Sequence, residues 1–148
     1  MQLTWHDRAF AELSVAELYA IIHLRERVFV VEQACVYLDA DGVDPKCRHV
    51  FATGEGGTLV AYARVVPAGV KYGSTAIGRV VIAPEVRGTG LARVLMEKAI
   101  AACPRGAPIE LGAQAHLEKF YASLGFARTG EVYVEDGIPH VDMLRVPG

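Results

Sequence analysis

VIAPEVRGTGLA, residues 81–92, is the most informative segment of the sequence, because an apolar strand-like run passes there through a glycine-rich turn into a helix. Backbone amides at the start of a helix lack intrahelical partners and lie at the positive end of its dipole. Gly88 and Gly90 place no side chain between the backbone and a ligand. The turn is therefore a candidate phosphate site.

Two common nucleotide motifs do not match this turn. A Walker loop ends in Gly-Lys-Ser/Thr, but Gly90 is followed by Leu91 and Ala92. A dinucleotide fingerprint needs a third small residue where Arg93 stands. Glu110 lies about 20 residues beyond the turn, as a ribose-binding acid would. The alternative interpretation is an ordinary strand-to-helix turn that contains two glycines and binds no ligand.

The element order predicts a mixed α+β protein with a mostly antiparallel central sheet flanked by helices. Ser14 and Glu17 have capping-box spacing, which predicts a helix from Val15 to about Val30. The further expected elements are a hairpin of strands 49–53 and 59–66, a strand 74–83, a helix 91–102, a strand 108–113, a helix 116–124 and a final hairpin of strands 127–134 and 140–146.

Length and charge exclude several classes of protein. The 148 residues suit a single domain, 1–148, and a hydrophobic share of 52% excludes general disorder. The net charge of −2 argues against nucleic acid and anionic membranes as partners. No apolar run approaches the roughly 20 residues of a membrane span, and the N-terminus lacks a signal-peptide core. We therefore expect a cytoplasmic protein.

No metal site or disulfide framework is predicted. Three cysteines form no CxxC pair and are expected to be reduced thiols: Cys35, Cys47 and Cys103. The acidic stretch from Asp39 briefly resembles a calcium loop, but its sixth and twelfth positions hold Asp44 and Val50 instead of Gly and Glu. A long loop at residues 32–49 is expected to line or cover an active site.

Two motifs resemble the GNAT superfamily of acyl-CoA N-acyltransferases. Arg87, Gly90 and Ala92 match its R/Q-x-x-G-x-G/A signature, and FYASLGF at 120–126 is similar to its second motif, F-Y-x-x-x-G-F. Further segments resemble the ElaA-like branch of this superfamily and extend the resemblance over nearly the whole chain: 18–19, 24–33, 37–44, 114–117 and 136–140.

The resemblance implies acetyl-CoA as cosubstrate. In that family the backbone amides of the glycine-rich turn hold the CoA pyrophosphate, and the thioester lies where two central strands splay apart. A main-chain amide near Val81 or Ile82 would polarise the thioester carbonyl. The residues implied to contact CoA are Val81, Ile82, Arg87, Gly88, Thr89, Gly90, Leu91 and Ala92.

Two proton transfers are needed for acetyl transfer to an amine. Tyr121 stands where the family often places the donor to the leaving thiolate, although an aromatic side chain there also suits a core. The carboxylate base of many relatives is absent from strand 77–81, so Glu32, Glu110 and His49 are the candidates. Arg79 on this apolar strand is expected to pair with an acid of the 32–44 loop or of the acceptor groove.

Acidic residues in the 32–44 loop favour a cationic primary amine as acceptor, in a small molecule, peptide or protein. Phe29 and Tyr37 are expected to flank it. Direct attack in a ternary complex is implied, so the cysteines are not expected to act as nucleophiles. Two alternatives remain, a non-catalytic CoA-binding module and an acyl-homoserine-lactone synthase, which residues 24–29 faintly echo. The final hairpin offers an edge for a homodimer.

Overall fold

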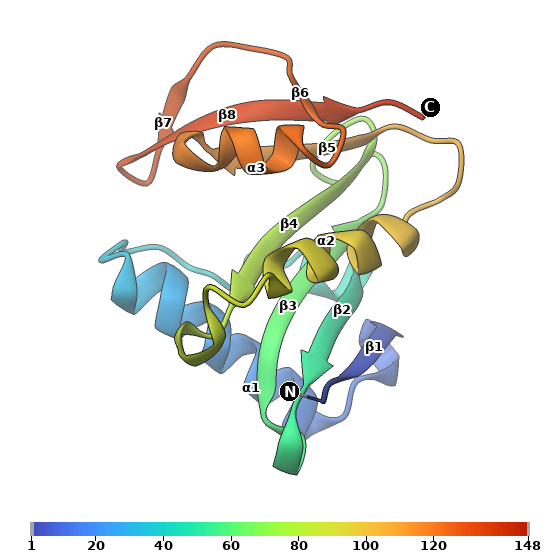
Figure 1. Ribbon diagram of the computed structural model, residues 1–148, viewed down its shortest axis with the longest axis vertical. Coiled ribbons are helices and arrows are strands. Elements are labelled where there is room, and N and C mark those ends of the chain that lie inside the picture. Colours follow the sequence, from blue (N-terminus) through green and yellow to red (C-terminus); the bar gives the residue numbers. More distant parts are fainter. Residues whose placement is uncertain (1, 148) are drawn as a thin grey trace.

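One eight-stranded mixed sheet organises the computed structural model, which describes residues 2–147 (Figure 1). The strand order is β1-β2-β3-β4-β5-β8-β6, and β7 pairs with β8. The strands are β1 Thr4–Ala9, β2 Arg48–Thr53, β3 Leu59–Val66, β4 Thr75–Ile82, β5 Ile109–Gln114, β6 Ala127–Arg128, β7 Tyr133–Glu135 and β8 Ile138–Arg145. Only β4 and β5 pair in parallel, which confirms the expected mixed, mostly antiparallel sheet.

Three α-helices flank the sheet: α1 Val15–Arg25, α2 Leu91–Ala101 and α3 Glu118–Ala122. The predicted capping box starts α1, since the Glu17 amide donates to Ser14 Oγ at 3.0 Å and the Ser14 amide donates to Glu17 Oε1 at 2.9 Å. The helix continues beyond the predicted Val30 as a π-helical segment, η2, Glu26–Glu32. Such wide turns are frequent at functional sites.

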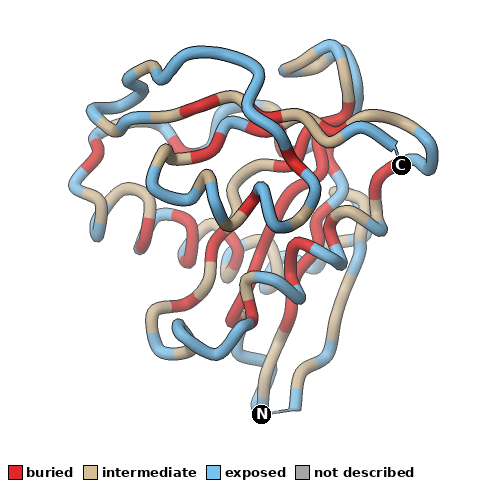
Figure 2. Tube along the Cα trace, turned by 45° about the horizontal axis from the view of Figure 1, so that its top comes forward, coloured by how far each residue is buried: buried red, intermediate tan, exposed pale blue. Residues whose placement is uncertain are grey.

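The sheet has a core on each face. Alternate residues of β3 separate the two cores, because Ala61 and Ala63 pack with α2 and α3 whereas Tyr62 packs with α1. Helix α1 therefore lies on the opposite face from α2 and α3. Buried residues gather along the central strands and on the helix sides that face them, while most loop residues outside the 32–49 segment are exposed or half-buried (Figure 2).

Strands β4 and β5 stay paired only at their starts, where Thr75 lies opposite Ile109 and Ala76 opposite Glu110. Beyond this point β4 continues to Ile82 with β3 on one side and no strand recorded on the other. A bulge at Arg79, whose φ is +50°, shifts the register with β3. The result is the gap between two central strands that the family resemblance implied.

Two expectations about elements need correction, and one strand was not expected. Strand β1 was not predicted, because TWHDRA is a largely polar edge segment that becomes a strand by pairing with β2. The expected strand 127–134 is two short strands, β6 and β7, with irregular backbone between them. The expected helix 116–124 is a 3₁₀ turn, Ala115–Leu117, followed by the short α3.

Within residues 2–147 no helix combines the length and apolar character that crossing a membrane requires.

Candidate active site

A cavity of about 580 Å³ lies along the gap between β4 and β5. Its walls include Gly78 and Val80 of β4, Leu111 of β5, Tyr121 of α3 and Tyr37 of the 32–49 loop. Phe29 also lines it, so both aromatic residues expected to flank an acceptor are at the cavity. This volume lies within the range that is typical of pockets for small organic ligands.

Tyr121 reaches this cavity from α3 and is 6% exposed. Its ring packs edge-on against Phe120 and Phe126, so it belongs to the core and also borders the gap. Burial raises the pKa of Tyr121 to about 12. No hydrogen bond to its hydroxyl is recorded within residues 2–147, so this neutral phenol is available as a donor to a group in the gap.

The glycine-rich turn leads directly into α2. Gly88 and Gly90 have φ of +77° and +78°, the left-handed region that favours glycine. Gly90 is the N-cap of α2, and no side chain caps this helix, so its first amides lack intrahelical partners. A Cβ at either glycine would meet no atom within 4 Å, so the backbone conformation, not crowding, requires glycine here. This arrangement fits a diphosphate.

Arg87, before the first glycine, makes a two-bond ion pair with Glu32 of η2, at 2.6 and 2.8 Å. Beside it, Arg27 pairs with Glu85. The hydrogen bond from Arg87 lowers the pKa of Glu32, which makes this carboxylate a weaker base. Glu32 is not among the residues that line the cavity, and its pairing with Arg87 also argues against a role as the base.

Val81 and Ile82 occupy the end of β4, where they pair with Tyr62 and Ala61 of β3. The Val81 side chain is buried in the α1 core, and Ile82 is half-buried against the other core. Their strand edge away from β3 faces the side on which β5 has diverged. This placement agrees with a backbone contact to a thioester or pantetheine group.

His49 has a structural position, which corrects its candidacy as a base. The side chain is fully buried and does not line the cavity. Its Nε2 donates to the Asp44 carbonyl at 3.0 Å, and Nδ1 lies 2.7 Å from the Tyr62 hydroxyl. Burial lowers the pKa of His49. Both nitrogens are engaged, so the imidazole has no route to a substrate.

Glu110 also lies away from the cavity lining. Its Oε2 accepts a hydrogen bond from the Ser74 amide at 3.3 Å, at the end where β4 and β5 are still paired. The carboxylate thus ties the start of β4 to β5. This local role replaces the base considered from sequence.

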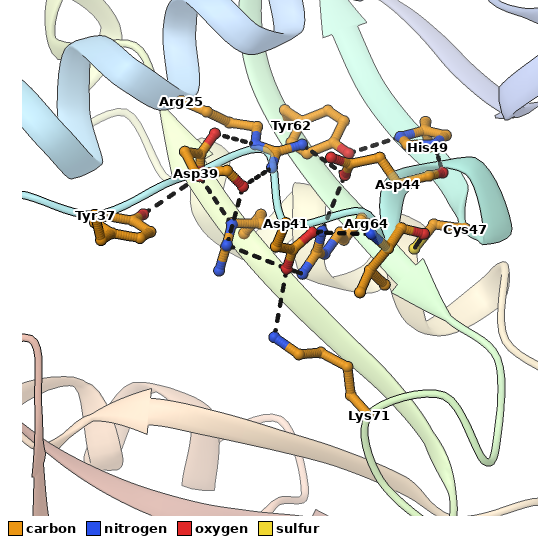
Figure 3. A network of polar contacts seen from close by, with 12 residues as sticks. Arg25, Tyr37, Asp39, Asp41, Asp44, Cys47, His49, Tyr62, Arg64 and Lys71 are labelled. Carbon is orange, nitrogen blue, oxygen red and sulfur yellow. Dashed lines mark hydrogen bonds and ion pairs between the residues drawn. The ribbon is translucent and has the colours of Figure 1, made fainter.

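A buried ion network covers the α1 face of β3 (Figure 3). The Arg25 guanidinium lies 2.8 Å from Asp39 and 2.7 Å from Asp44, and all three side chains are buried. Arg64 of β3 lies 3.0 Å from Asp44 and 2.7 Å from Asp41. Sequence reasoning missed Arg25 and Arg64, although a charge inside the apolar run LVAYARVV is itself a signal of a buried partner.

The remaining cations of the network come from β4 and the loop after β3. Arg79 Nε lies 2.9 Å from Asp39 and Nη2 3.3 Å from Asp41, which confirms its expected pairing with the acidic loop. Lys71 Nζ lies 3.5 Å from Asp41. Four cations therefore meet three carboxylates, so the acidic loop presents no net negative charge to the cavity.

These ion pairs set the protonation of the loop acids. The hydrogen bond from Arg64 is the main reason why the pKa of Asp41 is far below its usual value. Burial by itself raises the pKa of Asp44, but hydrogen bonds and charge from Arg25 and Arg64 bring it below the ordinary value. Both carboxylates are therefore ionised throughout the neutral range.

The environment of the cysteine thiols disfavours nucleophilic attack. All three cysteines are free and buried, and burial raises the pKa of Cys47 and Cys103 to about 11. A protonated thiol is a weak nucleophile. In the part of the chain that the structure describes, no cluster of three His, Cys, Asp or Glu side chains could hold a metal ion.

Comparisons with known proteins agree with this geometry. The family model described as an acetyltransferase (GNAT) domain matches residues 38–146. Protein ElaA of Escherichia coli K12 is 44% identical over 148 residues, covering 97% of this chain and 96% of the relative.

Solved structures give the same picture. An acyl-CoA N-acyltransferase from Pseudomonas aeruginosa is 43% identical with a TM-score of 0.93, covering 98% of this chain and 100% of that one. An aminoglycoside 6'-N-acetyltransferase complexed with coenzyme A shares the fold, with a TM-score of 0.68 at 16% identity and coverage of 95% and 96%. The chain therefore belongs to the GNAT acetyltransferase family, in the branch of the ElaA proteins.

Proposed function

We propose that the protein transfers an acetyl group from acetyl-CoA directly to a primary amine within a ternary complex. One observation carries the proposal: β4, which lines the gap bordered by Tyr121, leads through the glycine-rich turn into the open amides that start α2. A single segment, residues 77–92, thus provides both a cleft for a thioester and a cradle for a diphosphate. The two sites have the order along the chain that one extended CoA molecule requires.

The turn at residues 87–92 would hold the CoA diphosphate through backbone amides at the α2 N-terminus. Arg87 lies at the rim of the turn and would add a charged contact. The structural neighbour crystallised with coenzyme A supports this ligand, since that protein has the same fold.

The chain's own groups supply two further contributions. The diverging edge of β4 near Val81 and Ile82 would donate a backbone amide to the thioester carbonyl as negative charge develops there. Tyr121 would give its proton to the departing sulfur, and its raised pKa keeps the hydroxyl protonated until that step. As the nitrogen–carbon bond forms, the carbon–sulfur bond breaks.

We propose a cationic primary amine as the acceptor, in a small molecule, peptide or protein. The acidic side chains that would attract it are not those of the 39–44 loop. Those of the 39–44 loop are neutralised by arginines, as described above. Glu135 and Asp136, at the turn between β7 and β8, line the same cavity. These two carboxylates provide attraction for an ammonium group at the opposite wall.

A non-catalytic CoA-binding module is the second candidate. The observation that favours it is β4, whose only charged side chain is Arg79, where many relatives have a carboxylate. Such a module would bind CoA without consuming acetyl-CoA.

Thiol release from acetyl-CoA over a broad panel of amines, measured beside calorimetry with CoA, separates the two candidates. An acetyltransferase produces thiol with at least one amine, whereas a binding module gives heat of CoA binding and no thiol with any of them. A parallel incubation with S-adenosylmethionine and an acyl carrier tests lactone synthesis, and we expect no product.

A further inference from the structure

The proposed reaction lacks an evident proton acceptor. Strand β4 has no carboxylate, Glu32 is held by Arg87, and His49 lies outside the cavity. We propose that His140, assisted by Glu135, accepts the proton that the acceptor amine must lose. This inference rests on the proposed acetyltransferase function and names a residue of the same site.

His140 lies in β8 opposite Gln114, the last residue of β5 and therefore on the diverging side of the β4–β5 pair. It lines the cavity that Tyr121 also lines, and its side chain is 13% exposed. An imidazole in this position is sheltered from bulk water but open to a ligand in the gap.

His140 and Tyr121 reach the cavity from opposite faces of the sheet. Ala113 of β5 and Val141 of β8 pack with Tyr121 in one core. Because side chains alternate along a strand, the neighbouring cross-strand pair, Gln114 and His140, points to the other face. An amine would therefore meet His140 on one face, and the sulfur would leave beside Tyr121 on the other.

The backbone fixes the tautomer of His140. Its Nδ1 lies 2.7 Å from the Ile138 carbonyl oxygen, which can only accept a hydrogen bond, so Nδ1 carries a proton. In the neutral ring Nε2 then has a free lone pair. Nε2 lies 3.9 Å from Glu135 Oε2, which places a carboxylate beside the nitrogen that would take the proton.

The residues of β5, β7 and the β7–β8 turn that surround His140 include no cation. Tyr133 of β7 stacks on the ring at 5.9 Å between centroids, and its hydroxyl donates to Asp142 at 2.8 Å. From β5 the facing residue is the uncharged Gln114, and Asp136 in the β7–β8 turn adds a second acid. These charged groups are acidic, and the cations that line the same cavity, Arg64, Lys71 and Arg79, are paired with the acids of the 39–44 loop.

The protons balance in this scheme. An ammonium group has three protons and the amide product keeps one. His140 Nε2 takes one proton before attack and passes it to water. As the carbon–sulfur bond breaks, Tyr121 gives its proton to the coenzyme A sulfur. The second proton leaves the nitrogen of the new amide and returns through water to the Tyr121 oxygen, so that the whole reaction releases one proton.

The test compares His140→Gln with His116→Gln, a control on an exposed residue outside the cavity. We expect His140→Gln to lower kcat by about 10²–10⁴-fold, the usual contribution of a general base. Calorimetry should give unchanged CoA affinity for both variants. The acidic limb of the kcat/KM–pH profile should vanish in His140→Gln only, and added imidazole should restore part of the turnover of His140→Ala.

A second variant and a spectrum make the role of Glu135 testable. Glu135→Gln removes the carboxylate beside Nε2, so we expect kcat to fall while the affinity for CoA stays unchanged. Nitrogen-15 NMR of the wild-type protein should show the Nδ1–H tautomer for His140 at alkaline pH.

These experiments distinguish a failure of the proposed function from a failure of the assignment of His140 alone. A wild-type protein that acetylates no amine would overturn the proposed function and this inference with it. Wild-type turnover together with an unchanged acidic limb in His140→Gln, an Nε2–H tautomer or a failure of imidazole to restore turnover would overturn this inference alone.

Discussion

At the scale of single residues, Tyr121 has two roles that one substitution separates. Its ring packs against Phe120 and Phe126, whereas no protein partner is recorded for its hydroxyl among residues 2–147. Tyr121→Phe keeps the ring and removes the donor. We expect kcat to fall by about 10²-fold or more, with CoA affinity and thermal stability nearly unchanged. Steady-state assays beside calorimetry test this, and equal turnover in both proteins would remove Tyr121 from the mechanism.

Asp44 is the residue on which the buried network depends, because it contacts both Arg25 and Arg64. Asp44→Asn leaves two buried guanidinium groups short of a counter-charge, so we expect unfolding free energy to fall by about 3–5 kcal/mol in urea titrations. Asp7→Asn, which breaks the exposed pair with Arg48, is the control and should cost no more than about 1 kcal/mol. Similar losses in the two variants would contradict the account of the network.

The same network gives stability a definite pH dependence. The pKa values of Asp41 and Asp44 lie below their unfolded values, so their stabilisation is complete above an unfolded pKa of about 3.9. It is lost as pH falls from there toward the folded values, since the unfolded chain then binds more protons. Urea midpoints measured from pH 6 to pH 2 should fall steeply below about pH 4. The fall should be shallower in Asp44→Asn, and a parallel decline in both proteins would contradict this assignment.

At the scale of elements, the turn before α2 is the segment on which the proposed CoA site depends. Gly90 adopts φ +78° at the helix N-cap, and Gly106 adopts φ +72° in the loop after α2, each with open space around it. Alanine at either position costs roughly 1–3 kcal/mol of stability through backbone strain. Only Gly90→Ala should also weaken CoA binding, which calorimetry measures. An equal loss of affinity in Gly106→Ala would show that strain alone explains the effect.

Elements with strong local signals were predictable from sequence. The box at Ser14 and Glu17 and the glycine turn before Leu91 define both helix starts through backbone chemistry within a few residues. Strand β1 and the break between β6 and β7 were not predictable, because their conformations depend on pairing with distant strands.

At the scale of the whole molecule, the geometry of the glycine-rich turn was more predictable from sequence than that of the cavity walls. The proposed CoA site is one continuous segment, so its motif contains its geometry. The proposed acceptor site joins the 32–44 loop, β4 and the β7–β8 turn, and only the fold shows that Asp39, Asp41 and Asp44 are paired with arginines. His140 likewise could not be identified as a candidate base from the sequence, because its closeness to Glu135 and to the gap depends on the fold.

The proposed binding mode has one CoA molecule extending from the amides at the start of α2 into the gap between β4 and β5. A crystal structure of the protein with acetyl-CoA would show directly whether CoA binds in this way. We predict the diphosphate at residues 88–92 and the thioester sulfur beside the Tyr121 hydroxyl. Acetyl-CoA bound elsewhere, or crystals that stay empty at high acetyl-CoA concentration while calorimetry gives no heat, would contradict the account.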